Sequence, residues 1–499
     1  MTDLKKLSTV GVVLVIFSVV FGFNNSPLAF YRMGYASILW YLFAGVTFFL
    51  PVMFMVAEYA SSFKNSGGGG MYTWLTAAKG ELYGFVGAFI FYFAFMVWMI
   101  TVSIKIWIPM SSFLFGEDTT QSWSVLGLNS TQTIGVLAVV LMLLITFFAT
   151  RGFNKISFIA KFGGIANAAI NCLLYLASLA VLVLTGGDFA QPIEGVESFF
   201  CSPNAQSGDL FFIFGFITFA LFAYAGPESL GSLVEKTKST RAFSRGILIS
   251  ALFIAFGYSF SIFCWGISHN WSELFSAEGV NMGNVLYVMM GNLGHKLGVA
   301  LGLSAESALS MGVLFSRAVG FSVFMTYMGA FFTIIYSPLK TILDGAPQGL
   351  WPKFFSKKNR FDMPHIAMWI QTGVICFFVL MFSFGGQGAK SFYNILILLA
   401  NVAQTMPYLF ISAAFPAFRR NSALNHEYTL FKSKAMVYLA AVLVFFVDLL
   451  ANIFIVIHPI LAGENDAVYQ VVWMVGGPVL FFLAAVMIFY RYKRRSRRG

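Results

Sequence analysis

Charged residues and cysteines are both scarce in this chain, and the two shortages narrow its class. Only 10% of the 499 residues are charged, whereas soluble globular proteins average about 25%, so an ordinary soluble enzyme and a disordered scaffold are excluded. The four cysteines, at positions 172, 201, 264 and 376, show no C-x-x-C spacing, which argues against a disulfide framework or a cysteine-bound metal. We therefore expect neither a metal nor another cofactor.

Catalytic motifs are missing as well. The five histidines lie in loops or at the ends of apolar segments, and neither H-E-x-x-H nor G-x-S-x-G occurs. The segment GGQGAKS at 385–391 resembles a phosphate-binding loop, but it lacks the glycine before the lysine and falls in a short turn. The sequence therefore predicts that the protein is not an enzyme.

Apolar residues are abundant, at 59% of the chain. They form twelve runs, each near or above the roughly 20 residues that a transmembrane helix needs. This pattern predicts an all-α integral membrane protein with twelve transmembrane helices. The runs cover residues 8–33, 36–62, 83–111, 132–150, 156–185, 209–234, 244–268, 306–339, 365–384, 391–417, 435–458 and 469–490.

The net charge of +11 is explained by membrane orientation rather than by a nucleic-acid partner. Of the 31 Lys and Arg residues, 26 lie in the loops and termini of one side, and only Lys296 and Lys390 lie in the loops of the other. Positive residues collect on the cytoplasmic side of membrane proteins. We therefore expect a multi-pass protein of a bacterial-type cytoplasmic (inner) membrane, with both termini in the cytoplasm.

Two of the runs are interrupted. The first contains GFNNSP at 22–27 and the sixth contains AYAGPES at 223–229. Pro27 and Pro227 each lack an N–H group and crowd the carbonyl four residues earlier, which breaks or kinks a helix. Paired interruptions at corresponding places in two halves are typical of the midplane substrate site of a transporter, and two ordinary proline kinks are the alternative.

The interruptions predict a substrate site built largely from backbone groups. A half-helix starting at Pro27 would present N–H groups and a positive dipole end to a carboxylate, and the carbonyls freed before Pro227 would accept from an ammonium group. A small zwitterion, such as an amino acid, suits both. The predicted lining residues are Phe21, Gly22, Phe23, Asn24, Asn25, Phe222, Ala223, Tyr224, Ala225 and Gly226.

Several motifs resemble those of the amino acid–polyamine–organocation (APC) permeases. AEYASSFKNSGGGGMYTW at 57–74 is similar to the stretch that joins helices 2 and 3 of that family, and YAGPES at 224–229 is similar to its helix 6 motif, with Glu228 on the family's glutamate. AKFG at 160–163 and SPLK at 337–340 resemble the glutamate/GABA antiporter branch.

This resemblance implies the APC-type 5+5 inverted repeat with broken helices 1 and 6. The first five-helix repeat would cover residues 1–185, the second 186–417, and two additional helices with a basic tail 418–499. The resemblance also implies that Phe222 is the aromatic residue that covers bound substrate.

Two departures limit what the resemblance implies. GFNNSP stands where many members of the family have a G-S-G run, and Ala330 stands where glutamate/GABA exchangers carry a glutamate. We therefore do not extend glutamate-for-GABA exchange to this chain.

Charged residues inside the apolar runs are further candidates, because a charge at membrane depth is costly and usually functional. Glu228 adjoins the second interruption and is predicted to carry a proton or to brace the backbone. Lys105 and Arg317, in the outer halves of their runs, are predicted to form a cationic vestibule, with snorkelling to the surface as the alternative for Lys105. Glu58, near the cytoplasmic end of its run, is predicted to brace a gate.

Together these features predict a secondary active transporter, a permease or antiporter for an amino acid or related zwitterion, that works by alternating access. We expect proton coupling or exchange rather than sodium coupling, because AFFTII at 330–335 offers only the Thr333 hydroxyl as a side-chain oxygen ligand. A transporter-fold amino acid sensor and an amine or polyamine exchanger are the alternatives, and the sequence leaves a homodimer open.

Overall fold

The computed structural model describes residues 6–63, 70–424, 426, 428–463 and 466–496, with the backbone alone at 206, 230, 232, 233 and 387–401. Over these residues the regular structure is helical, apart from two isolated β-bridges. The longer helices are α1 (Thr9–Val19), α2 (Asn25–Met33), α3 (Ser37–Ala44), α4 (Leu50–Ser62), α5 (Met71–Lys79), α6 (Glu81–Lys105), α7 (Trp107–Phe115), α8 (Ser130–Ala149), α9 (Phe153–Leu184), α11 (Leu210–Ala223), α12 (Thr240–Ser268), α14 (Val285–Ala300), α15 (Ala305–Ile334), α16 (Ser337–Asp344), α17 (His365–Phe384), α18 (Gly386–Arg420), α19 (Lys434–Leu461) and α20 (Ala467–Ser496). Short helices α10 (Glu197–Phe200) and α13 (Trp271–Ser276) lie in loops.

The all-helical class predicted from the sequence is confirmed. Among the described residues, ten helical stretches are long and apolar enough to cross a membrane, and Thr9–Val19 is a shorter apolar helix. In addition, α18 lies where the sequence places its tenth span. The count of twelve spans and the 5+5 repeat stay predictions.

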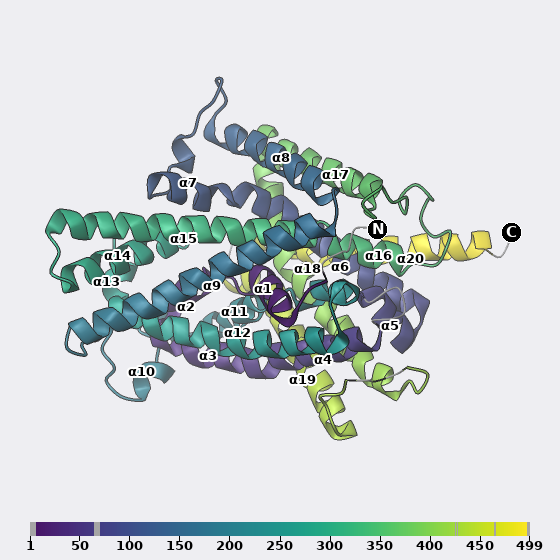
Figure 1. The fold of residues 1–499 in the computed structure, drawn as a ribbon, viewed down its shortest axis with the longest axis horizontal. Coiled ribbons are helices and arrows are strands. Elements are labelled where there is room, and N and C mark those ends of the chain that lie inside the picture. Colours follow the sequence, from purple (N-terminus) through teal and green to yellow (C-terminus); the bar gives the residue numbers. More distant parts are fainter. Residues whose placement is uncertain (1–5, 64–69, 425, 427, 464–465, 497–499) are drawn as a thin grey trace.

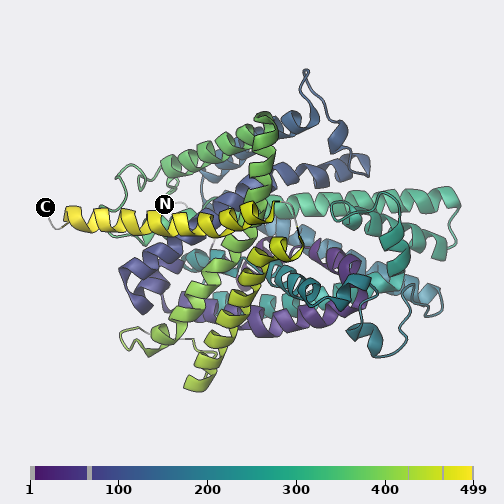
Figure 2. The same ribbon diagram turned by 180° about the vertical axis from the view of Figure 1, so that it is seen from behind.

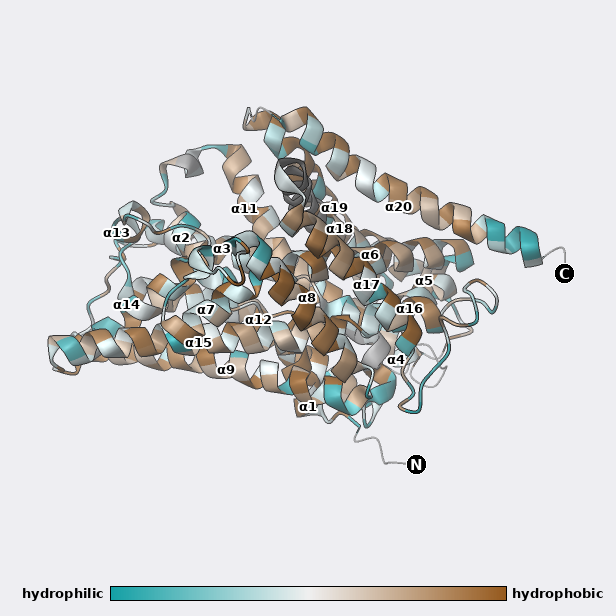
Figure 3. Ribbon diagram, turned by 90° about the horizontal axis from the view of Figure 1, so that it is seen from above, coloured by the Kyte–Doolittle hydropathy of each residue, from teal (hydrophilic) through white to brown (hydrophobic). Residues whose placement is uncertain are grey.

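The helices form an elongated bundle whose two ends carry different connections (Figure 1). One end of the long axis holds α5, α16 and the end of α20, and the opposite end holds α7, α10, α13 and α14. The last three helices, α18, α19 and α20, lie together on one face of the bundle (Figure 2). Hydrophilic residues gather toward helix ends, most visibly over the last turns of α20 (Figure 3). This distribution is the one that an apolar slab around the middle of the bundle requires.

Both predicted helix breaks are present, with shifted bounds. The first runs from residue 20 to 24, so α2 begins at Asn25 and not at Pro27 as predicted. Pro27 lies in the first turn of α2. Proline is tolerated there because N–H groups of the first turn form no hydrogen bond within the helix, so the missing N–H of proline costs nothing. The second break covers residues 224–226 and is followed by a 3-10 helix, η5 (Pro227–Lys236). Gly226 has a φ of 121°, a conformation that a residue with a side chain rarely adopts.

Glycines let α9 approach its neighbours closely. A Cβ on Gly164 would lie 1.9 Å from the carbonyl oxygen of Leu14 in α1, and a Cβ on Gly163 would lie 2.5 Å from that of Met325 in α15. Small residues at helix crossings permit this backbone proximity in membranes. The first half-helix is thereby held directly against α9.

Replacing Gly164 by alanine should therefore destabilise the protein. The added methyl group collides with backbone and not with a movable side chain, so the helices must separate, at a cost of about 1–3 kcal/mol. The measurement is the thermal unfolding midpoint of the purified protein in detergent. Gly373→Ala is the control, because a Cβ there meets nothing within 4 Å, and an equal fall for both variants would contradict the packing argument.

Candidate functional site

A cavity of about 280 Å³ lies between the two helix breaks. Its walls come from both breaks and from α6, α15 and α18. Eight residues singled out from the sequence line it: Gly22, Asn24, Asn25, Lys105, Phe222, Ala223, Ala225 and Gly226. Residues more than 190 positions apart in the chain are thus brought to one small chamber.

Tyr258 of α12 joins the two breaks. Its hydroxyl oxygen accepts hydrogen bonds from the Gly22 N–H (2.9 Å) and from the Asn25 side-chain amide (3.1 Å). Its hydroxyl hydrogen faces the carbonyls of Ala223 (3.0 Å) and Val20 (3.3 Å). Some of the backbone groups that the sequence assigns to substrate are therefore already satisfied by this tyrosine.

Tyr408 of α18 makes a similar link behind the second break. The Gly226 N–H donates to the Tyr408 hydroxyl oxygen at 2.7 Å, and the Tyr408 hydroxyl donates to Oε2 of Glu228. Glu228 is buried, does not line the cavity, and has no ion-pair partner among the residues that the structure describes. Tyr408 therefore links the Glu228 carboxylate to the backbone N–H of Gly226, which lines the chamber.

The charge of the cavity comes from a single residue. Lys105 is the only charged residue among the described lining residues, and no acidic residue accompanies it. Gln404 of α18 also lines the cavity, and its buried Nε2 has no hydrogen-bond partner among the described groups. A cation and an unpartnered amide donor together suit a ligand with a carboxylate.

Arg317 and Glu58 lie away from the cavity. Arg317 is exposed on α15 and passes near Gly116 at the end of α7, so it does not join Lys105 in lining the chamber. Glu58 is buried in α4, where its Oε1 accepts from the Phe431 N–H at 2.9 Å and its Oε2 lies 3.2 Å from Nη1 of Arg419. These contacts join α4 to the end of α18 and to the loop that follows it.

Three other predicted lining residues also point elsewhere. Phe23 packs against Trp265, and the Tyr224 hydroxyl donates toward the Tyr41 carbonyl at 3.1 Å. Phe21 faces a second, larger cavity of about 700 Å³ between α1, α9 and α12.

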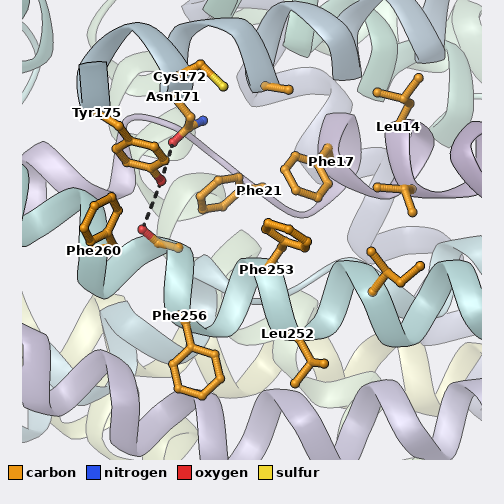
Figure 4. A pocket seen from close by; sticks show the side chains of 14 residues that line it. Leu14, Phe17, Phe21, Asn171, Cys172, Tyr175, Leu252, Phe253, Phe256 and Phe260 are labelled. Atoms are coloured by element: carbon orange, nitrogen blue, oxygen red, sulfur yellow. Dashed lines mark hydrogen bonds between the residues drawn. The ribbon is translucent and has the colours of Figure 1, made fainter. Parts of the chain in front are cut away.

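That second cavity is apolar (Figure 4). Phe17, Phe21, Phe253 and other hydrocarbon side chains surround it, and Tyr175 turns its hydroxyl toward Oδ1 of Asn171 at 3.4 Å. It is a poor site for a zwitterion, because its walls offer few groups to replace the hydration of two charges. The cavity between the helix breaks is the better candidate.

The sequence reasoning missed Tyr258, Tyr408 and Gln404. The sequence does show that these polar side chains lie inside apolar runs, in the segments GYSF at 257–260 and QTMPY at 404–408. A buried tyrosine hydroxyl needs a hydrogen-bond partner. What the sequence does not contain is the position of that partner, since each hydroxyl bonds backbone more than 30 residues away.

Known proteins similar to this chain are transporters. A family model described as amino acid permease matches residues 7–486. The inner membrane transporter YjeM of Salmonella typhimurium is 45% identical over 99% of this chain and 97% of its own length. The aspartate/glutamate permease AcaP of Lactococcus lactis subsp. cremoris is 23% identical, covering 100% and 97% of the two chains, and a glutamate/gamma-aminobutyrate antiporter of Lactococcus lactis subsp. lactis is 21% identical, covering 99% and 92%. These similarities confirm the resemblance carried by the sequence motifs.

Proposed function

The chain belongs to the amino acid permease family and is a membrane transporter rather than an enzyme, and from this premise we propose that it carries an amino acid or related zwitterion by alternating access. The observation that carries this proposal is the chamber between the two helix breaks, where Lys105 is the one charged residue among the described wall residues. Its volume, about 280 Å³, is just below the roughly 300–1,000 Å³ typical of small-molecule sites. A single amino acid therefore suits it better than a peptide.

The proposed substrate carries a carboxylate. Lys105 and the free amide of Gln404 both donate, whereas an amine or polyamine needs an acidic residue in the wall, and none is present among the described lining residues. Two of the similar proteins are named for aspartate, glutamate or gamma-aminobutyrate, all of which contain a carboxylate. This combination favours an amino acid over a polyamine.

Transport should be independent of sodium. A sodium site where the first and eighth spans meet needs several oxygen ligands, and the hydroxyl of Thr333 donates within its own helix to the Gly329 carbonyl at 3.0 Å. A Cβ on Gly329 would lie 3.0 Å from Cβ of Ser18, so the two helices are in direct contact there. We propose proton coupling or exchange as the energy source, in the cytoplasmic membrane, with both termini in the cytoplasm.

The test uses the purified protein in lipid vesicles with imposed gradients of sodium or pH, and with amino acids preloaded inside. We expect labelled amino acid to enter in response to a pH gradient or to internal substrate, and the rate to be unchanged when sodium is replaced by choline. Accumulation driven by sodium alone would contradict the proposal. Binding without any uptake under all three conditions would instead identify a sensor with a transporter fold.

A further inference from the structure

A basic pocket lies between the end of α18 and the start of α19. It has a volume of about 480 Å³, and its lining includes the polar residues Arg419, Arg420, Lys432, Ser433 and Lys434. We call this group of five residues the basic pocket. It lies apart from the substrate chamber, with which it shares no lining residue.

The positive charge of the pocket is mostly uncompensated. Arg419 is engaged, since its Nη1 lies 3.2 Å from Oε2 of Glu58 and its Nη2 donates to the Phe431 carbonyl at 3.1 Å. Arg420, Lys432 and Lys434 make no ion pair with an acidic residue in the part of the chain that the structure describes. Three cations around one hollow suit a phosphate group, which accepts charge-assisted hydrogen bonds from Arg and Lys.

An apolar stripe continues from the pocket along the outside of α19. Leu439, Val442, Phe446 and Leu450 recur at intervals of three and four residues, and each is about half exposed or more. Such spacing places them on one face of the helix. A soluble anion would use the basic pocket alone, whereas a molecule with a phosphate and long hydrocarbon chains would use both.

We propose that the basic pocket binds the phosphate headgroup of an anionic phospholipid, whose acyl chains lie along the α19 stripe. Basic pockets between helix ends on the cytoplasmic side bind such headgroups, and this side of the chain holds most of its Lys and Arg residues. The proposal does not depend on the substrate carried in the chamber.

The bound lipid would stabilise a particular part of the bundle. Glu58 accepts the N–H groups of Leu430 and Phe431 and pairs with Arg419. The lipid headgroup would therefore lie beside the contacts that hold α4 against the α18–α19 loop. Anionic lipid should raise the thermal unfolding midpoint of the whole protein, because a ligand that binds only the folded state stabilises it.

The experiment measures lipid binding to the full-length purified protein in a neutral detergent. Phosphatidylglycerol, phosphatidylcholine and sn-glycerol 3-phosphate are titrated separately, bound lipids are counted by native mass spectrometry, and the unfolding midpoint is followed. We expect phosphatidylglycerol alone to bind and stabilise. Equal binding of phosphatidylcholine would overturn the proposal, and equal stabilisation by sn-glycerol 3-phosphate would show a site for soluble anions instead.

Two triple variants separate a built pocket from general surface charge. The test variant is Arg420→Gln, Lys432→Gln and Lys434→Gln. The control, Lys353→Gln, Lys357→Gln and Arg360→Gln, removes the same charge from exposed positions of the loop before α17. Each juxtamembrane cation contributes a factor of about five to anionic-lipid binding, so the test variant should bind on the order of 100-fold more weakly, and the control as the parent does.

An equal loss in both triple variants would show that the preference is diffuse and would overturn the proposal. If the test variant does not fold, the single variant Lys434→Gln replaces it, with an expected loss of about fivefold. Lys353→Gln is then the matched control, and a loss of the same size there would contradict the proposal.

Discussion

Replacing Lys105 by methionine should weaken the transport of carboxylate-bearing substrates by roughly 10- to 100-fold. Lys105 is the one charged residue among the described residues that line the chamber, and a hydrogen bond to a charged group contributes about 1.5–3 kcal/mol. Methionine keeps most of the length and the apolar character of the side-chain stem but has neither the charge nor the N–H donors. The measurement is the concentration of amino acid that half-saturates uptake into vesicles, compared with that of the decarboxylated amine of the same side chain.

The matched control is Arg317→Met. The sequence groups Arg317 with Lys105 as one cationic vestibule, but in the structure Arg317 lies beside Gly116 at the end of α7 and does not line the chamber. We expect this variant to retain uptake within about twofold, because Arg317 does not line the chamber and so does not contact the substrate there. A similar loss of uptake in Lys105→Met and Arg317→Met would support the predicted vestibule formed by both residues. A similar loss of uptake for the amino acid and for its decarboxylated amine in Lys105→Met would show that Lys105 only supports the fold.

The helix breaks, and with them part of the chamber wall, could be predicted because they depend on local chemistry. Proline and glycine both weaken a helix, so Pro27 and Pro227, at corresponding places in two apolar runs, indicate both breaks before their neighbours in the fold are known. The bounds of the breaks could not be predicted as well, because a helix accepts proline in its first turn. The start of α2 at Asn25 follows from that tolerance.

The direction of each side chain could not be predicted from the sequence. Phe21 and Phe23 lie in the same break as Gly22, yet Phe21 turns toward the apolar cavity and Phe23 toward Trp265. Tertiary packing determines which way each side chain points, and a local sequence pattern carries no information about that packing. The same holds for Tyr258, whose importance arises from two backbone segments about 200 residues apart.

Replacing Glu228 by glutamine should abolish transport driven by a pH gradient while leaving exchange intact. Glu228 is buried, has no cationic partner among the described residues, and accepts a hydrogen bond from Tyr408, which also bonds the Gly226 N–H of the chamber wall. Ionisable residues placed in this way inside a membrane commonly form proton relays. Glutamine keeps the size and polarity of the side chain but cannot release a proton.

The control for this variant is Asp448→Asn, which makes the same chemical change at another buried carboxylate. Asp448 lies in α19, and its Oδ1 bonds Asn452 at 3.2 Å rather than a residue of either helix break. It should therefore retain coupling. We expect a one-unit pH gradient to raise the ratio of internal to external substrate to about ten in the parent and in Asp448→Asn. In Glu228→Gln the same ratio should stay near one.

Tyr408→Phe separates a proton-carrying role from static bracing at Glu228. Removing the hydroxyl leaves the carboxylate able to take up a proton but breaks its connection to the Gly226 N–H. If Glu228 carries the coupled proton, this variant should shift the pH dependence of uptake while Glu228→Gln removes it. If Glu228 only braces the second break, both variants should lower the unfolding midpoint and the exchange rate together, by about 1–3 kcal/mol in stability, and neither should change the response to pH. A parent protein that exchanges substrate yet ignores the pH gradient would contradict the proton-carrying role of Glu228.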